Sequence, residues 1–149
     1  MRLFIVLLLC TFQVNAQVFT QKDTLRGALS PDRTWFDVNY YHLNLEVDPN
    51  SKSIVGFNDI AFTVLENSNV MQLDLFENML IDSVIYKGLS CGVTRTFDAF
   101  FIDFPHDLSV GSYEELRVYY QGVPIEAKRA PWDGGFVWKK DESGLPWIG

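Results

Sequence analysis

The sequence contains only two cysteines, Cys10 and Cys91. Cys10 lies in an N-terminal apolar run, and removal of that run as a leader would leave Cys91 alone. A single cysteine excludes a disulfide framework in the mature chain, although exported domains often use one. A catalytic thiol would need a histidine and an acidic group close in space, and the nearest basic residue that follows Cys91 in the sequence is Arg95. We therefore interpret Cys91 as a partly buried structural residue in a loop.

Histidine is equally scarce. His42 and His106 lie in separate segments and form neither H-x-x-x-H nor H-E-x-x-H, so the sequence predicts no metal site, no cofactor and no catalytic residue in this chain. The letters GLSCG resemble a nucleophile elbow, but that motif needs a strand-to-helix turn, and strand-like sequence follows here. No glycine-rich loop leads into a helix, which removes the usual cradle for nucleotide phosphates. Most of the many carboxylates are expected on strand faces that are exposed to solvent, so their number alone does not indicate a catalytic acid–base pair.

Clustered positive charge is missing as well. The net charge is −7, and the densest basic sites are the pairs Lys128-Arg129 and Lys139-Lys140. Nucleic-acid binding rests on many Lys and Arg contacts to phosphate, so this class of partner is excluded. The chain is 48% hydrophobic and 15% aromatic, which is too apolar for a disordered protein. A length of 149 residues indicates one globular domain.

No apolar run is long enough to cross a bilayer. The run from Leu3 to Cys10 falls far short of the roughly 20 residues required. Arg2, this run and the small residue Ala16 form the pattern of a signal peptide over residues 1–16, which predicts a secreted or periplasmic protein. Lipid anchoring at Cys10 is the disfavoured alternative, because Leu9 stands where a lipobox requires a small residue.

Helical periodicity is also absent, and alternation of apolar and polar residues takes its place. Residues 17–33 are polar and mixed, and we interpret them as an N-terminal extension before a domain of residues 34–149. The first strand of that domain is expected to have one buried and one exposed face. The turn sequence DPNSKS then predicts an antiparallel hairpin. The buried faces of this hairpin are expected to hold Tyr41, Leu43, Leu45 and Val47 from the first strand, and Ile54, Ile60, Phe62 and Val64 from the second.

Further strands are expected at residues 71–75, 80–86, 98–104 and 113–122. The third of these should bury Phe100, Ile102 and Phe104 and should end at Pro105. The last should bury Leu116, Val118 and Tyr120. Short strands at regular spacing, with turn signals between them, predict an all-β fold in the form of an antiparallel sandwich or saddle.

The order of these segments resembles one protein family. FDVNYYHLNLEVDPNSKSIVGFNDIAFTV opens the domain, MQLDLFENMLIDSVIYKG and LRVYYQGVP follow, and APWDGGFVWKKDESGLPWIG closes it. Together they resemble the N-terminal β-saddle domain of the aminopeptidase N-like zinc metallopeptidases, the family that includes leukotriene hydrolase. The resemblance runs from about Asp37 to Gly149.

The resemblance implies zinc, a peptide substrate and hydrolysis of N-terminal residues for a complete enzyme, but not for this chain alone. In that family the zinc-binding H-E-x-x-H, a distant glutamate ligand and a G-x-M-E-N substrate loop follow the saddle domain, and none of them occurs here. No catalytic or metal-binding residue can therefore be transferred to a position of this sequence. The resemblance implies an inactive fragment whose main partner is the missing catalytic domain.

The closing block concentrates three of the four tryptophans of the chain. Aromatic side chains dominate the energetics of interfaces, so we expect this block to form a seam with the missing domain. The competing interpretation is a hydrophobic end of the domain's own core. The alternative function is a free-standing secreted β-sandwich that binds a peptide, a glycan or a protein partner. The candidate docking residues are Trp132, Phe136, Trp138 and Trp147.

Overall fold

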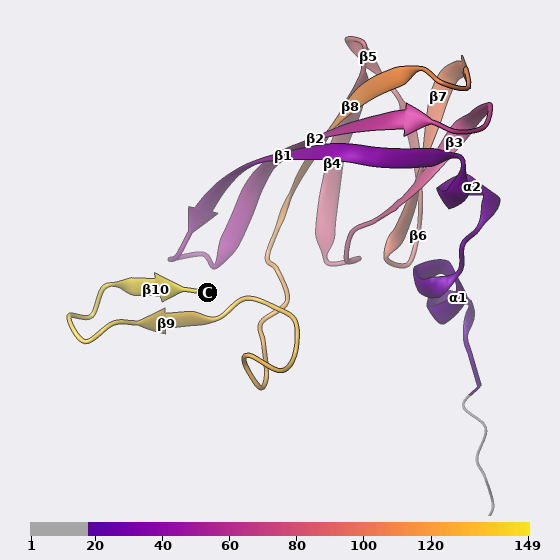
Figure 1. Cartoon of the computed structure of the whole chain (residues 1–149). Helices are drawn as coiled ribbons and strands as arrows, with labels where there is room; N and C mark the ends of the chain where they lie inside the picture. Colours follow the sequence, from indigo (N-terminus) through magenta and orange to yellow (C-terminus); the bar gives the residue numbers. More distant parts are fainter. Residues whose placement is uncertain (1–17) are drawn as a thin grey trace, which may run out of the picture.

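The computed structural model describes residues 18–149, in which two antiparallel sheets pack against each other and a small hairpin arm follows at the C-terminal end (Figure 1). The all-β fold class predicted from the sequence is confirmed. The signal peptide expected at residues 1–16, with Cys10, lies outside the described residues. Within the described residues, no helix is both long and apolar enough to span a membrane.

Within residues 18–149, two short helices precede ten strands. The helices are α1 (Gln21–Gly27) and α2 (Pro31–Thr34). The strands are β1 (Phe36–Asp48), β2 (Ser53–Val64), β3 (Ser68–Asp74), β4 (Met79–Tyr86), β5 (Leu89–Ser90), β6 (Gly92–Thr96), β7 (Ala99–Leu108), β8 (Tyr113–Gly122), β9 (Trp138–Lys140) and β10 (Pro146–Ile148).

The core lies between a five-stranded sheet of order β1-β2-β8-β4-β5 and a three-stranded sheet of order β3-β7-β6. Phe62, Val84 and Ile102 are fully buried there. Burial of such side chains stabilises the fold by roughly 1.5–3 kcal/mol each. Trp35 closes one end of the core: its indole N–H donates to the carbonyl oxygen of Val70 at 2.6 Å, and its ring meets Phe62 edge-on.

The alternation predicted for the last two long strands is confirmed. In β7, Phe100, Ile102 and Phe104 are buried. In β8, Leu116 and Val118 are buried and Tyr120 is partly buried against the core. Each set faces the opposite sheet, because side chains of one parity share one face of a strand.

The expected burial of β1 is wrong. Tyr41, Leu43, Leu45 and Val47 share the inner face of the sheet, but they are 54, 58, 41 and 37% exposed. Figure 1 shows the reason: the hairpin of β1 and β2 extends beyond the three-stranded sheet, so that sheet does not cover the far half of β1, although Ile54 of β2 is buried. We call the surface formed by these four side chains the open face.

The strand expected to end at Pro105 continues to Leu108. Proline donates no backbone hydrogen bond, so within sheets it is confined to edges and irregular positions. Pro105 occupies such a position. Strand β6 pairs only with residues 99–103 of β7, and the register between β3 and β7 shifts between Ser68 and Val70.

Cys91 lies between two short strands rather than in the loop we expected. Strand β5 ends at Ser90 and β6 begins at Gly92, and the backbone N–H of Cys91 donates to the carbonyl of Val84 at 2.9 Å. The side chain is 9% exposed, and burial raises the pKa of its thiol. A buried thiol with a raised pKa is a poor nucleophile, which fits a structural role.

The segment interpreted as an N-terminal extension, residues 17–33, contains α1 and all of α2 except Thr34, and no apolar periodicity predicts either helix. Helix α1 begins with a capping box: Thr20 accepts a hydrogen bond from the backbone N–H of Asp23, and the Asp23 carboxylate accepts one from the Thr20 backbone. Neither helix has a buried residue. Local capping therefore specifies α1, and the domain boundaries remain predictions.

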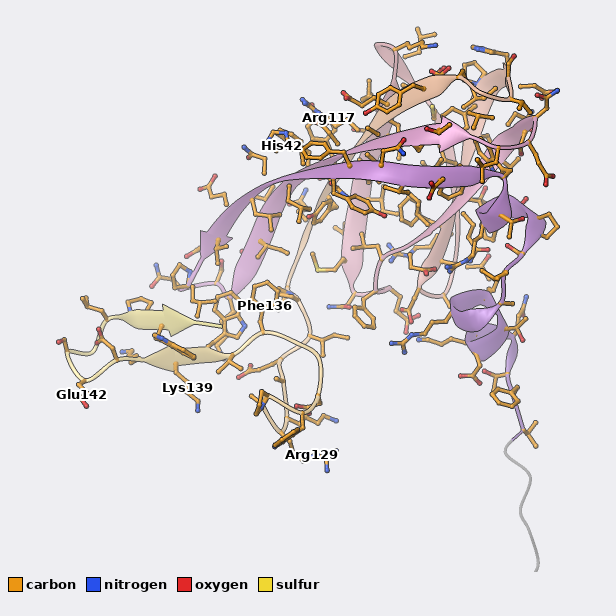
Figure 2. The ribbon with its side chains drawn as sticks, in the orientation of Figure 1. His42, Arg117, Arg129, Phe136, Lys139 and Glu142 are labelled. Carbon is orange, nitrogen blue, oxygen red and sulfur yellow. The ribbon has the colours of Figure 1, made fainter. Side chains whose placement is uncertain are left out.

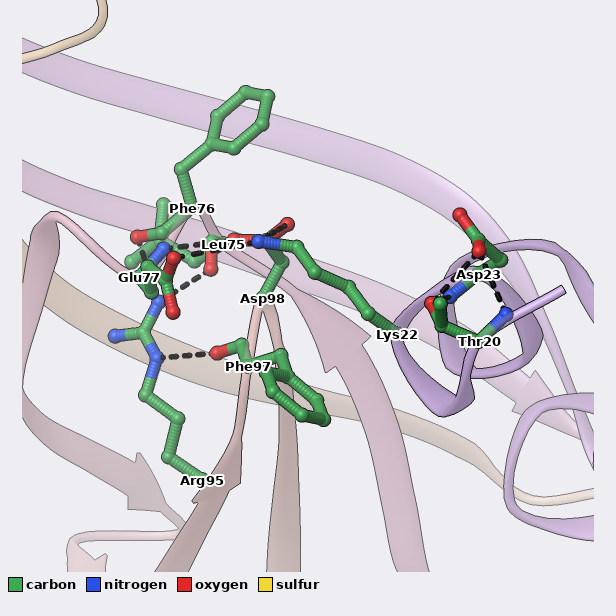
Figure 3. Close-up of polar contacts among 9 residues, drawn as sticks. All are labelled: Thr20, Lys22, Asp23, Leu75, Phe76, Glu77, Arg95, Phe97 and Asp98. Carbon is green, nitrogen blue, oxygen red and sulfur yellow. Dashed lines mark hydrogen bonds and ion pairs between the residues drawn. The ribbon is translucent and has the colours of Figure 1, made fainter. Parts of the chain in front are cut away.

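Polar contacts hold this segment to the strands, as Figure 3 shows for α1. The Lys22 ammonium lies 3.3 Å from the carboxylates of both Glu77 and Asp98. Nearby, the Arg95 guanidinium donates to the carbonyl oxygens of Leu75, Phe76, Phe97 and Met79, which fixes the β3–β4 turn. These bonds use carbonyl oxygens in and beside the turn as acceptors, which ties the turn to the Arg95 side chain of β6.

Candidate docking surface

The chain leaves β8 through a connector whose path depends on Gly135. This residue has a φ of +133°, and an added Cβ would lie 2.6 Å from the carbonyl oxygen of Ile125. The close approach allows the backbone N–H of Phe136 to donate to the same carbonyl at 2.7 Å, and that of Ala127 to donate to the Phe136 carbonyl at 2.9 Å. Only glycine fits both the conformation and the space.

The arm formed by β9 and β10 is a small antiparallel hairpin. Val137 and Gly149 exchange backbone hydrogen bonds of 2.7 and 3.1 Å beyond its paired residues. Its turn is closed by Asp141, whose Oδ1 accepts from the backbone N–H groups of Ser143 and Leu145. Such an aspartate turn fixes the chain reversal without any hydrophobic contact.

A second loop precedes the arm and carries Trp132. The Asp133 carboxylate accepts hydrogen bonds from the backbone N–H groups of Lys128 and Arg129, at 2.7–2.9 Å. The peptide bond between Ala130 and Pro131 is cis. The loop is thus tied at its base, and it presents a Trp132 side chain that is 87% exposed.

The four candidate docking residues do not form one patch. Phe136 and Trp138 stack with ring centroids 5.4 Å apart. Trp147 pairs with Lys139 across the arm, whereas Trp138 pairs with Ile148, so the two tryptophans point to opposite sides. In Figure 2, Phe136 lies between the arm and the main sheet, while Lys139 projects away from it. The structure therefore brings two of the four together and separates Trp132 and Trp147.

The arm lies beside the turn between β1 and β2. Pro49 and Lys52 of that turn line one cavity with Trp138 and Ile148 of the arm. Lys52 also forms an ion pair with Glu126 at 3.1 Å, but both side chains are about half exposed, so it adds little stability. Trp138 of the stacked pair thus lies next to the turn at the far end of the β1–β2 hairpin.

The open face is the feature that sequence reasoning missed, because alternation does not reveal whether a second layer covers a strand. A neighbouring feature did have a signal: Phe36 and Val38 have even numbers, whereas the apolar residues from Tyr41 to Val47 have odd numbers. This change of parity marks the bulge that the structure places between Val38 and Tyr40. Exposed apolar surface of this extent is typical of interaction sites.

The outer face of the same sheet carries a polar cluster around Arg117. The guanidinium donates to both oxygens of Asp59, at 2.5 and 2.8 Å, and lies 3.9 Å from the centroid of the Phe57 ring. These hydrogen bonds hold the pKa of Asp59 below its usual value, against the effect of burial. His42 Nδ1 lies 3.3 Å from Asp59 as well. Arg117 satisfies the hydrogen-bonding needs of the Asp59 carboxylate, so a stabilising role in the sheet accounts for this cluster.

No catalytic arrangement is found in the described part of the chain. His106 lies against the Tyr86 ring, in a different contact set from His42. Among residues 18–149, no group of three His, Cys, Asp or Glu side chains is placed to hold a metal ion. These side chains do not fit a zinc site, and the zinc of the resembled family is expected only in a full-length parent enzyme.

Comparison with known proteins gives structural matches alone. No family model and no curated protein matches the sequence. A point mutant of a two-domain M1 zinc metallopeptidase bound to L-arginine matches with a TM-score of 0.58 and 20% identity, over 76% of this chain and 28% of that chain. The M1 zinc metallopeptidase from Deinococcus radiodurans matches with a TM-score of 0.58 and 20% identity, over 74 and 27%. A mutant of the Deinococcus enzyme bound to a Tyr-Ser-Ala substrate matches at 21% identity.

The chain therefore spans less than a third of the length of the proteins that it matches. At this identity the likeness concerns the fold, and it confirms the fold that the sequence resemblance implied: the chain folds as part of the M1 zinc metallopeptidases does.

Proposed function

We propose that this chain is the N-terminal, non-catalytic domain of a secreted zinc aminopeptidase. The observation that carries the proposal is the structural match, which covers most of this chain but only 28% of the zinc metallopeptidase. The order of sequence segments supports the N-terminal position. The absence of a fitting zinc site among residues 18–149 supports a non-catalytic role.

In this proposal the catalytic domain docks on the open face and on the neighbouring arm. Leu43 and Leu45 are 58 and 41% exposed although they belong to the inner side of the sheet. An apolar face that its own domain leaves uncovered is stabilised when another domain excludes water from it. The aromatic candidates contribute unequally to this interface. Trp132 and Trp147 are exposed and available to the catalytic domain, whereas Phe136 and Trp138 already stack on each other.

Two measurements on the purified chain test the non-catalytic role. After zinc loading and dialysis, we expect no stoichiometric zinc by elemental analysis and no release of N-terminal residues from a tripeptide such as Tyr-Ser-Ala. One bound zinc per chain with turnover would contradict the proposal. A His42→Ala, His106→Ala double variant is the control that would then locate the activity in this chain.

A third measurement tests the parent enzyme. We expect the transcript to continue in frame after the Gly149 codon and to encode H-E-x-x-H. Co-expression of that downstream segment with this chain should give a stable zinc-containing complex, and Leu43→Asp should weaken it. An in-frame stop codon after Gly149 would instead favour a free-standing binding module, a role that the uncovered apolar face also permits.

A further inference from the structure

Strand β1 forms one edge of the five-stranded sheet (Figure 1). Among residues 18–149 it pairs only with β2, and every residue from Tyr40 to Asp48 is exposed. We call this stretch the free edge. It contains no lysine, arginine or proline, and the bulge of β1 lies before it. Sheet edges are usually kept from pairing with other chains by lysine, proline, bulges, short length or covering segments.

The other edges of the two packed sheets have such protection. At the opposite edge of the same sheet, β5 is only two residues long. In the three-stranded sheet, β6 has five residues, and β3 has a bulge between Ser68 and Val70 and lies beside α2. Of the sheet edges described in residues 18–149, that of β1 is therefore the one best suited to accept another strand.

The backbone of β1 indicates which groups face the free edge. The carbonyl oxygen of Asn44 points toward β2, because it would lie 1.9 Å from a Cβ added to Gly56 of that strand. In an antiparallel ladder, residues bonded to the partner strand alternate with residues whose N–H and C=O groups point away from it. The residues of the free edge whose backbone groups point outward are therefore Tyr41, Leu43, Leu45 and Val47.

These four residues pair completely with the same four residues of a second copy. In a two-fold antiparallel arrangement centred on Asn44, Leu43 pairs with Leu45 of the second copy, and Tyr41 pairs with its Val47. Each pair exchanges two backbone hydrogen bonds, so every outward group of the free edge has a partner. Side chains of one parity share one face, so the two open faces join on the same side of the combined sheet.

Neighbouring registers leave outward groups without partners. A centre moved by one residue toward the turn would place Tyr41 opposite Pro49, which has no N–H to donate. A centre moved the other way would place Val47 opposite Asn39, the extra residue of the bulge. A centre between two residues would place outward backbone groups opposite inward ones. The bulge and the turn thus select the register centred on Asn44.

The charges of the free edge fit the same register. Its carboxylates are Glu46 and Asp48, and like charges directly opposite each other destabilise a strand pair. Centred on Asn44, the pairing sets Glu46 opposite His42 and Asp48 opposite Tyr40 of the second copy. No carboxylate then faces another, and the net charge of the strand does not oppose its alignment with itself residue by residue.

We propose that two copies of this chain associate through their free edges and form one continuous sheet. The ladder closes on its two-fold axis, so association stops at the dimer. The inference goes beyond the proposed aminopeptidase and does not depend on it. It uses the backbone at the edge of β1, whereas the proposed catalytic domain docks on the face of the sheet.

Sedimentation velocity of the purified chain over a series of concentrations is the first test, and it needs no variant. We expect a reversible equilibrium of monomer and dimer without larger species. A chain that remains monomeric at every concentration would overturn the inference. Growth beyond the dimer would also overturn it, because a closed two-fold ladder offers no further free edge.

Cysteine cross-linking tests the register. In a Cys10→Ser background, Asn44→Cys should form an intermolecular disulfide on mild oxidation. The two copies of residue 44 face each other with their Cα atoms roughly 4.5 Å apart, which a disulfide can span. Cys91 is buried and should stay reduced. His42→Cys and Glu46→Cys are the matched controls: neither should cross-link alone, but their mixture should. A disulfide formed by Glu46→Cys alone would refute the register.

A charge variant distinguishes the edge from the face. Asn44→Lys places two ammonium groups opposite each other on the axis and should weaken the dimer about tenfold or more. Asn69→Lys makes the same change at an exposed residue of β3 and should leave the dissociation constant unchanged. A dimer that Asn44→Lys does not weaken would show that the open faces hold the copies together, and this result would overturn the inference.

Discussion

The buried contact between Tyr86 and Glu114 allows a quantitative prediction of stability. The Tyr86 hydroxyl donates to Glu114 Oε2 at 2.7 Å, and the Lys87 ammonium lies 2.9 Å from the same oxygen. Tyr86 is 1% and Glu114 8% exposed. Hydrogen bonds to charged groups contribute about 1.5–3 kcal/mol, more than bonds between neutral groups. We therefore expect Tyr86→Phe to lower the free energy of unfolding by about 2 kcal/mol.

The effect of Glu114 should depend on pH. Burial raises the pKa of this carboxyl, but the hydrogen bonds from Lys87 and Tyr86 outweigh burial, so that its pKa is lowered from the usual 4.5. A lowered pKa in the folded state means that the stabilisation is present above pH 4.5 and is lost as the pH falls through the folded value. Glu114→Gln should accordingly destabilise the chain at pH 7 and lose that effect in acid.

Urea unfolding between pH 2.5 and 7 measures this difference. The gap between the parent chain and Glu114→Gln should be about 1–2 kcal/mol at pH 7 and should shrink below pH 4.5. Glu115→Gln, the neighbouring exposed carboxylate on the outer face, is the control and should show no such change. A gap that stays constant over the whole pH range would refute the argument from ionisation.

Three further changes have direct tests. Gly135→Ala should disrupt the connector, because its Cβ would clash with the Ile125 carbonyl, and limited proteolysis should then cleave near the arm. The uncovered open face predicts that the isolated chain self-associates, and Leu43→Ser should reduce this in sedimentation while it changes the free energy of unfolding by less than about 1 kcal/mol, since the side chain is largely exposed. Trp132→Ala should leave the thermal midpoint of the isolated chain unchanged, and a drop of several degrees would show that the loop packs on the domain.

The sequence predicted the fold class and most of the core, because alternation reports which side chains share a face. Phe100 and Leu116 are buried as their parity required. Alternation does not report how far the opposite sheet extends. For that reason Leu43 has the pattern of a core residue and the exposure of a surface residue.

Other features were hidden for different physical reasons. Helix α1 depends on the local bonds of Thr20 and Asp23, which leave no apolar periodicity. A cavity of about 510 Å³ between the two sheets is lined by residues from the N-terminal segment, β2 and β3, and sequence spacing alone does not indicate that these segments meet.

The unequal length of the two sheets also has a dynamic consequence. Near Phe62 the β1–β2 ladder is backed by a packed layer, whereas near Leu45 strand β1 is held mainly by its ladder to β2, which itself stays paired with β8. Local opening requires little free energy where few apolar contacts are lost. The far half of the hairpin should therefore fray in the native state, with amide protons that exchange much faster than those near Phe62.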